Sequence, residues 1–171
     1  MQCSGRLSKA GLALLVLVQM LVVAFPAMAE PPAGYSFLRY DEGLRRATAE
    51  NRPVFLYFGR YGCGFCDKTN KESFSDAAVK QAYSENYVLV YANSESMDRL
   101  VLPSGERITE MQLGERMNTL GTPVFFFLEP DGREILKVYG FQDARQLLGM
   151  DRYIQAGNYA NVSFKDFKRT H

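Results

Sequence analysis

The chain has 171 residues, with 20 Lys and Arg against 19 Asp and Glu, so its formal net charge is +1. Charges this close to balance give no electrostatic reason to expect a nucleic acid or an anionic membrane as partner. With 47% hydrophobic residues, a chain of this length can bury the core of one ordinary domain without disulfides to hold it.

The first 29 residues have the layout of a secretory signal peptide. Two basic residues precede an apolar run over 10–25, and the small-residue site 27–29 follows. We expect cleavage after this site, which leaves a mature domain over 30–171, makes the protein periplasmic and removes any membrane attachment. An uncleaved anchor is the alternative, because the apolar run is near the lower limit of about 17 residues for spanning a bilayer.

The mature chain would keep two cysteines. Cleavage removes Cys3 and leaves Cys63 and Cys66, which are separated by only two residues. Such a chain has no disulfide framework, so chemistry or a metal must explain the pair.

The apolar pattern predicts helices and strands in alternation. Uninterrupted aromatic runs are typical of strands buried on both faces, and Pro130-Asp131-Gly132 is a strong turn signal. We see no internal repeat. In chain order we expect helix 41–51, strand 54–58, helix 63–72, helix 76–83 with Ser75 as its N-cap, strand 87–91, a hairpin excursion with arms 100–102 and 106–108, helix 109–117, strands 123–128 and 134–139, and helix 143–155.

This order predicts an α/β domain with one mixed sheet covered by helices on both faces. The core extends over about 41–155. The polar segment 158–171 is expected to be a loosely held tail.

The motif Cys63-Gly64-Phe65-Cys66 follows a buried strand and begins a helix. Free backbone N–H groups and the positive end of the helix dipole stabilise a thiolate there, which lowers the pKa of the first cysteine below the model value of about 8.5. We therefore expect Cys63 to be the attacking sulfur. Cys66, one helical turn away, can resolve the mixed disulfide. The pair is itself the redox-active group, and we expect no cofactor or metal.

Three other uses of the pair compete with this one. A zinc site needs two more ligands, and the mature chain offers only His171, so metal would require a dimer or carboxylates. Haem attachment needs a histidine after the second cysteine, where Asp67 stands. A purely structural disulfide gains little, because the ring it closes is small.

A second motif, Gly121-Thr122-Pro123, stands immediately before the strand 124–127. Together with Cys63-Gly64-Phe65-Cys66, it resembles the thioredoxin superfamily, and more closely its exported SoxW-like branch and the C-terminal domain of DsbD-like proteins. The resemblance covers about 41–155 and implies a thioredoxin-like fold. The stretch around 94–108 is similar to a small insertion in the SoxW-like branch.

The resemblance also implies roles for the second motif. In that family the proline matching Pro123 is cis and lies beside the cysteines, and the preceding residue, here Thr122, offers backbone hydrogen bonds to a substrate chain. The residues alone support only a proline that starts a strand at the edge of a sheet. We expect Phe65 to face solvent, where it either contacts the partner or packs against the adjacent loop.

Two positions depart from the family. Tyr57 stands where many thioredoxins place a buried acid that accepts the proton of the resolving cysteine, and a phenol with a pKa near 10 is a poor base at neutral pH. Tyr61-Gly62 replaces the common tryptophan before the first cysteine. We therefore expect a different docking surface.

These features predict a thiol-disulfide oxidoreductase that reduces disulfides of client proteins through Cys63 and Cys66. The resemblance implies a DsbD- or CcdA-like membrane thiol transporter as electron donor, and we expect a monomer. One alternative is a disulfide oxidase or isomerase for folding clients. Another is a non-catalytic thioredoxin-fold binding module.

Overall fold

The computed structural model describes residues 31–170. The expected signal peptide over 1–29 and the residue His171 lie outside this range. Within the described range, no helix combines the length and the apolar character needed to cross a membrane.

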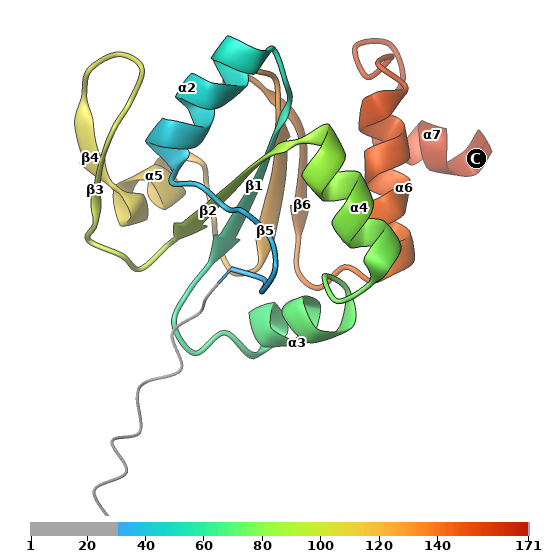
Figure 1. Ribbon diagram of the computed structural model, residues 1–171, viewed down its shortest axis with the longest axis horizontal. Helices are drawn as coiled ribbons and strands as arrows, with labels where there is room; N and C mark the ends of the chain where they lie inside the picture. Colours follow the sequence, from blue (N-terminus) through green and yellow to red (C-terminus); the bar gives the residue numbers. More distant parts are fainter. Residues whose placement is uncertain (1–30, 171) are drawn as a thin grey trace, which may run out of the picture.

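A four-stranded sheet forms the centre of the molecule (Figure 1). Its strands are β1 (Val54–Gly59), β2 (Val88–Asn93), β5 (Val124–Leu128) and β6 (Glu134–Tyr139). They lie in the order β2-β1-β5-β6, with β1 parallel to β2 and antiparallel to β5, and β6 antiparallel to β5. The mixed sheet expected from the sequence is confirmed.

Strands β1 and β5 are buried because both faces of the sheet are covered. Alternate side chains enter two separate cores: Phe55 and Phe127 pack on one face, and Leu56 and Phe126 on the other, all at 0% exposure. Each such side chain contributes roughly 1.5–3 kcal/mol on burial. Two-sided burial therefore explains why the sequence of these strands is continuously apolar.

Helices cover both faces, as the sequence predicts. Apolar residues of α2 and α5 pack in one core, and those of α4 and α6 pack in the other. Helix α3 follows β1 at one end of the sheet (Figure 1). The bounds are α2 (Tyr40–Glu50), α3 (Gly64–Glu72), α4 (Ala77–Asn86), α5 (Glu110–Arg116) and α6 (Ala144–Gln155).

The predicted hairpin excursion is a small two-stranded sheet, β3 (Arg99–Val101) and β4 (Arg107–Thr109). Leu100 and Ile108 are paired across it and are buried in the core that contains α2. Thr109 then caps α5 through a reciprocal capping box with Gln112. The insertion is therefore anchored on the domain and leads directly into a helix.

Ser75 is not the N-cap of α4, so that prediction was wrong. The Asp76 carboxylate accepts hydrogen bonds from the backbone N–H groups of Ala78 and Val79, at 2.8 and 3.1 Å. The Ser75 hydroxyl instead donates to the Lys71 carbonyl at 2.6 Å. Serine and aspartate are nearly equally favourable at the N-cap position. The turn between α3 and α4 therefore decides which of the two residues occupies it.

The C-terminal segment is not a loosely held tail, because it contains helix α7 (Phe164–Thr170). Phe167 is buried, and the ring of Tyr153 on α6 lies 5.2 Å from that of Phe164 and 5.3 Å from that of Phe167. Two aromatic residues three positions apart give this short, charged helix one apolar side. That side attaches it to α6.

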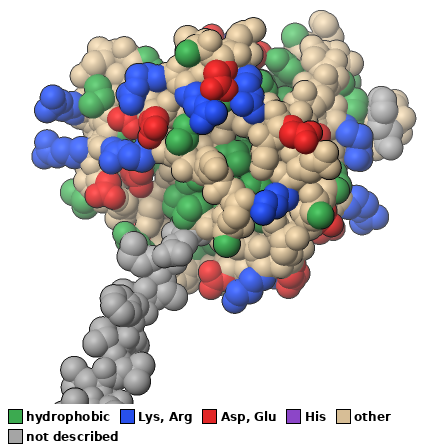
Figure 2. Space-filling model, viewed as in Figure 1, with side chains coloured by type: hydrophobic (Ala, Val, Ile, Leu, Met, Phe, Trp, Pro, Cys, Tyr) green, Lys and Arg blue, Asp and Glu red, His purple; other side chains and the backbone are tan. Residues whose placement is uncertain are grey.

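Acidic and basic side chains are interspersed on the face shown in Figure 2. That face carries no broad patch of one sign, in agreement with the nearly balanced composition.

Candidate active site

The turn between β1 and α3 presents the first cysteine at a helix start. Gly62 has a φ of 61°, in the left-handed region that favours glycine. The resembling family has tryptophan at this position, and a side chain of that kind would be strained in this backbone conformation. Cys63 follows as the N-cap of α3.

The sulfur of Cys63 acts as the cap of the helix. Its Sγ accepts a hydrogen bond from the backbone N–H of Cys66 at 3.1 Å. The same donor is available to a thiolate, which the positive end of the helix dipole also stabilises. This is the environment that the sequence predicts for an attacking cysteine.

Cys63 and Cys66 form a disulfide in the structure. The two residues are only 5% and 2% exposed, so overall accessibility barely distinguishes them. The capping contact does distinguish them, since only Cys63 occupies the N-cap. The geometry therefore favours Cys63 as the residue that meets a partner.

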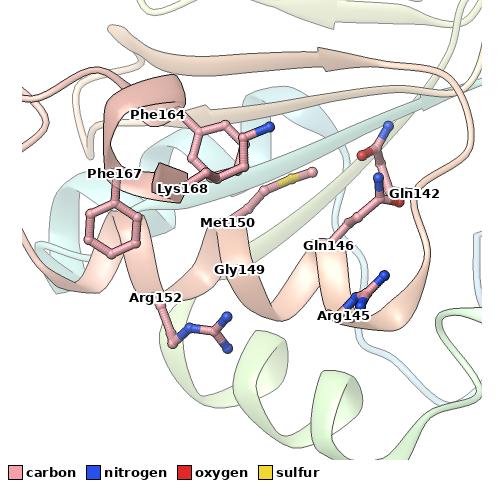
Figure 3. Close-up of a pocket in the computed structure, with 9 residues that line it drawn as sticks. All are labelled: Gln142, Arg145, Gln146, Gly149, Met150, Arg152, Phe164, Phe167 and Lys168. Carbon is pink, nitrogen blue, oxygen red and sulfur yellow. The ribbon is translucent and has the colours of Figure 1, made fainter. Parts of the chain in front are cut away.

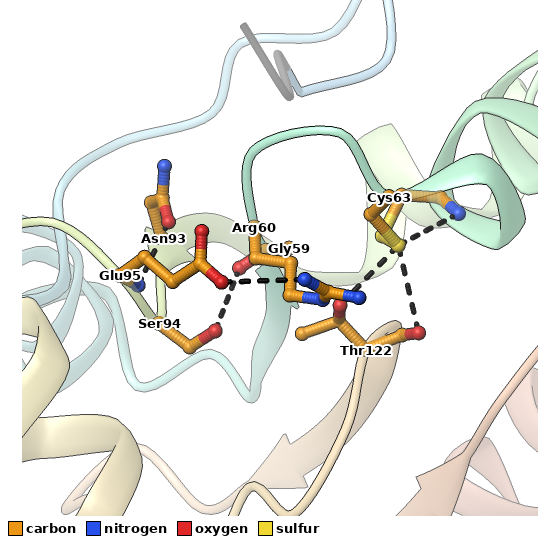
Figure 4. Close-up of polar contacts among 8 residues, drawn as sticks. Gly59, Arg60, Cys63, Asn93, Ser94, Glu95 and Thr122 are labelled. Carbon is orange, nitrogen blue, oxygen red and sulfur yellow. Dashed lines mark hydrogen bonds and ion pairs between the residues drawn. A yellow bond between two sulfur atoms is a disulfide. The ribbon is translucent and has the colours of Figure 1, made fainter.

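Thr122 and Pro123 lie beside the disulfide, and the peptide bond between them is cis, as predicted. The Thr122 hydroxyl donates to the Sγ of Cys63 at 3.2 Å, and the Thr122 carbonyl oxygen lies 3.5 Å from the same atom (Figure 4). The second motif thus reaches the first across 59 positions of sequence. Whether Thr122 and Pro123 bind substrate stays a prediction.

Exposed apolar side chains come from the segments that carry both motifs. Phe65 is 64% exposed, which confirms that it faces solvent. Tyr61 is 42% exposed and Leu120 is 86% exposed. We call these three residues the apolar rim. Sequence reasoning missed Leu120, because nothing in a polar loop shows that the loop contacts Cys63 through Thr122, which places Leu120 on the same loop as a site residue.

Tyr57 is completely buried under the site. Its hydroxyl donates to the Oδ1 of Asn70 on α3 at 3.2 Å. Burial, and then the neighbouring Tyr91 and Asp67, raise the pKa of this phenol far above its ordinary value of 10. Tyr57 therefore stays protonated and cannot accept the proton of Cys66, as its chemistry led us to expect.

Helix α3 is tied down at its far end as well. The hydroxyl of Ser73, which is 0% exposed, donates to the backbone carbonyl of Gln142 at 2.6 Å. On the same helix, the Nζ of Lys68 lies over the ring of Phe141, 4.3 Å from the ring centroid. The helix that carries both cysteines is thus fixed to the loop before α6.

A groove of about 680 Å³ is lined mainly by the loop 118–122, with further residues from the insertion and α5. On one wall, Arg60 and Glu95 form an ion pair at 3.3 Å (Figure 4). The Ser94 hydroxyl lies beside them and donates to the Gly59 carbonyl at 3.2 Å. The sequence did not disclose this use of the insertion, since the groove exists only once α5 packs beside the proline loop.

No group of three or more His, Cys, Asp or Glu side chains within residues 31–170 is arranged to hold a metal. His171, the residue considered as a zinc ligand, is outside that range.

Known proteins share both the sequence pattern and the fold. The chain is 29% identical over 109 residues to the thiol:disulfide interchange protein DsbD of Ralstonia nicotianae and 31% identical over 100 residues to DsbD of Salmonella paratyphi A. These matches cover 63% and 57% of this chain but only 16% of either relative.

Solved structures agree with the fold. A thioredoxin from Thermus thermophilus superposes with a TM-score of 0.58 at 25% identity, over 71% of this chain and 87% of that one. The reduced C-terminal domain of Neisseria meningitidis DsbD gives 0.52 at 18% identity, over 66% and 90% of the two chains.

A family model described as a thioredoxin-like domain matches residues 40–155. This span contains the sheet, the Cys63–Cys66 disulfide and the cis peptide bond. The chain therefore belongs to the thioredoxin-like domain family.

Proposed function

We propose that this chain is a periplasmic thiol-disulfide oxidoreductase that reduces disulfides of client proteins. The observation that carries the proposal is the sulfur of Cys63 at the N-cap of α3, within hydrogen-bonding distance of Thr122. The proposed direction draws on the DsbD relatives, which are named for thiol:disulfide interchange.

The reaction begins with the reduced pair. The Cys63 thiolate attacks one sulfur of a client disulfide, the client S–S bond breaks, and the departing client sulfur takes a proton from water. Cys66 then loses its proton and attacks the Sγ of Cys63. The second client thiolate leaves, and the Cys63–Cys66 disulfide forms, so two electrons have passed to the client.

Water is the proposed acceptor of the Cys66 proton. Burial raises the pKa of the Tyr57 phenol, so the phenol keeps its own proton at neutral pH and cannot take the proton of Cys66. The disulfide formed in each cycle must then be reduced by an external dithiol, and we assign that task to a DsbD- or CcdA-like membrane thiol transporter.

The apolar rim supports a protein as substrate. Phe65, Tyr61 and Leu120 expose large side chains, and such exposed apolar surface marks sites of protein contact. A client segment that lies over the rim would bring its disulfide to Cys63. We propose that the protein works as a monomer.

Equilibration with glutathione tests the direction. We expect the reduction potential of the Cys63–Cys66 pair to be close to that of thioredoxin, about −270 mV. A potential near about −120 mV would reject the reductase and favour the oxidase.

Trapping tests the mechanism in cells. With Cys66→Ala, the mixed disulfide at Cys63 cannot be resolved, so client proteins should be recovered as covalent adducts. The double variant Cys63→Ser/Cys66→Ala is the matched control and should recover none. If neither variant yields covalent adducts and the Cys63→Ser protein keeps its full function, the non-catalytic binding module is favoured.

A further inference from the structure

A second groove, of about 300 Å³, lies between α6 and α7 (Figure 3). Its floor is apolar and consists of Met150 from α6 with Phe164 and Phe167 from α7. None of the residues that line it belongs to either cysteine or proline motif. Its volume is at the lower end of the range for ligand pockets, about 300–1,000 Å³, so it suits one or two inserted side chains.

Three cations surround this floor, and no acidic residue lines it. Arg145 and Arg152 come from α6, and Lys168 comes from α7. Among the ion pairs found within residues 31–170, none involves these three side chains. The groove therefore offers positive charge that its own walls do not neutralise.

The acidic residues of these two helices are engaged elsewhere. Asp151 accepts hydrogen bonds from the side chains of Asn86 and Tyr87, each at 2.9 Å. Asp166 pairs with Arg169 at 3.0 Å. Neither lines the groove, so an anion that compensates the three cations must come from a ligand.

The spacing of the two arginines indicates what kind of ligand fits. Arg145 and Arg152 are seven positions apart on α6, which is two turns on one side of the helix and about 10.5 Å along its axis. In Figure 3 the two arginines lie toward opposite ends of the groove, and the Met150 side chain extends from a different side of α6. Two carboxylates at a similar spacing can pair with both guanidinium groups while the ligand covers the apolar floor.

We propose that this groove binds an acidic segment of a partner protein, in which an apolar side chain lies between two carboxylates about two helical turns apart. The apolar side chain packs on the floor against Phe164, the one of its three residues that is not buried, and the carboxylates pair with Arg145 and Arg152. This inference does not depend on the thiol chemistry, since it uses neither cysteine.

A stapled helical peptide tests the proposal. The peptide carries two glutamates seven positions apart, with leucine and phenylalanine three and four positions after the first, and a fluorescein label. Fluorescence anisotropy with the full-length chain should show saturable binding that weakens as added salt screens the charges. The same peptide with glutamines in place of the glutamates should bind at least about tenfold more weakly.

Charge reversal locates the site. The double variant Arg145→Glu/Arg152→Glu should lose at least about tenfold in affinity. Arg107→Glu, an exposed arginine of the β3–β4 hairpin, is the matched control and should bind like the wild type. Circular dichroism verifies that each variant is folded, and insulin reduction should be unchanged in all of them.

Three results would each overturn the proposal. They are no binding of the acidic peptide to the wild-type chain, equal binding of the glutamine peptide, and equal affinity of the double variant and the Arg107→Glu control. If the wild-type protein does not reduce insulin, that result rejects the proposed oxidoreductase. It does not affect the proposal for the groove.

Discussion

The Thr122 hydroxyl donates a hydrogen bond to the Sγ of Cys63 at 3.2 Å, and so connects the proline loop to the start of α3. The same sulfur accepts the backbone N–H of Cys66 at 3.1 Å. Two donors therefore converge on one sulfur, one fixed by the helix and one supplied by a side chain that can be replaced.

Removing the replaceable donor should make Cys63 less reactive at neutral pH. A hydrogen bond to a charged group contributes about 1.5–3 kcal/mol. In reduced Thr122→Val, the pH at which Cys63 is half-maximally alkylated by iodoacetamide should therefore rise by about one to two units. Thr48→Val, which removes a hydroxyl on α2, is the control. An unchanged midpoint in Thr122→Val would show that the Thr122 donor does not act on the thiolate.

The apolar rim should matter for protein substrates and not for small ones. Phe65→Ser/Leu120→Ser should lower kcat/KM for insulin disulfides by about tenfold, because the lost contact area stabilises the bound client. Reduction of hydroxyethyl disulfide should be unchanged. Val101→Ser, which removes an exposed apolar side chain from the hairpin, should alter neither activity. A parallel loss with both substrates would point to damage at the cysteines themselves.

Burial of Tyr57 should make stability fall at alkaline pH. The folded protein holds the phenol proton above pH 10, where the unfolded chain releases it, so the free energy of unfolding decreases as pH rises through the unfolded pKa of about 10. Tyr57→Phe should reduce this slope by up to about 1.4 kcal/mol per pH unit. Urea denaturation between about pH 9 and 11 measures the slope. The exposed Tyr61→Phe is the control, and an equal effect in both variants would contradict the prediction.

Helix α7 should contribute measurably to the stability of the domain. Phe167→Ala removes a buried ring that contacts Tyr153 and should cost about 3 kcal/mol in the free energy of unfolding. Lys165→Ala, at an exposed position on the same helix, should change it by less than about 0.5 kcal/mol. Equal stabilities of the two variants would mean that α7 is not part of the folded core.

The sequence was sufficient where one segment carries its own signal. Aromatic runs such as 54–58 and 123–128 have only one use in a small domain, as strands covered on both faces. The Cys63–Cys66 motif lies at a strand-to-helix junction, and its position as the N-cap followed from that junction. The cis bond at Pro123 came from the resemblance, because the residues alone supported only the start of an edge strand.

What the sequence missed depends on segments that meet only in the fold. Leu120 became part of the rim because the proline loop lies against Cys63, and Asn70 became a partner of Tyr57 because the fold brings α3 within hydrogen-bonding distance of the Tyr57 hydroxyl. The tail was misread because Phe164 and Phe167 are apolar positions within a polar stretch, and their partner Tyr153 lies on another helix.

The bond from Ser73 to the Gln142 carbonyl has a consequence for turnover. It fastens the trailing end of α3 to the body of the domain through an O–H···O hydrogen bond that involves neither cysteine. The disulfide at the leading end can therefore open or close without breaking the contact that holds the trailing end in place.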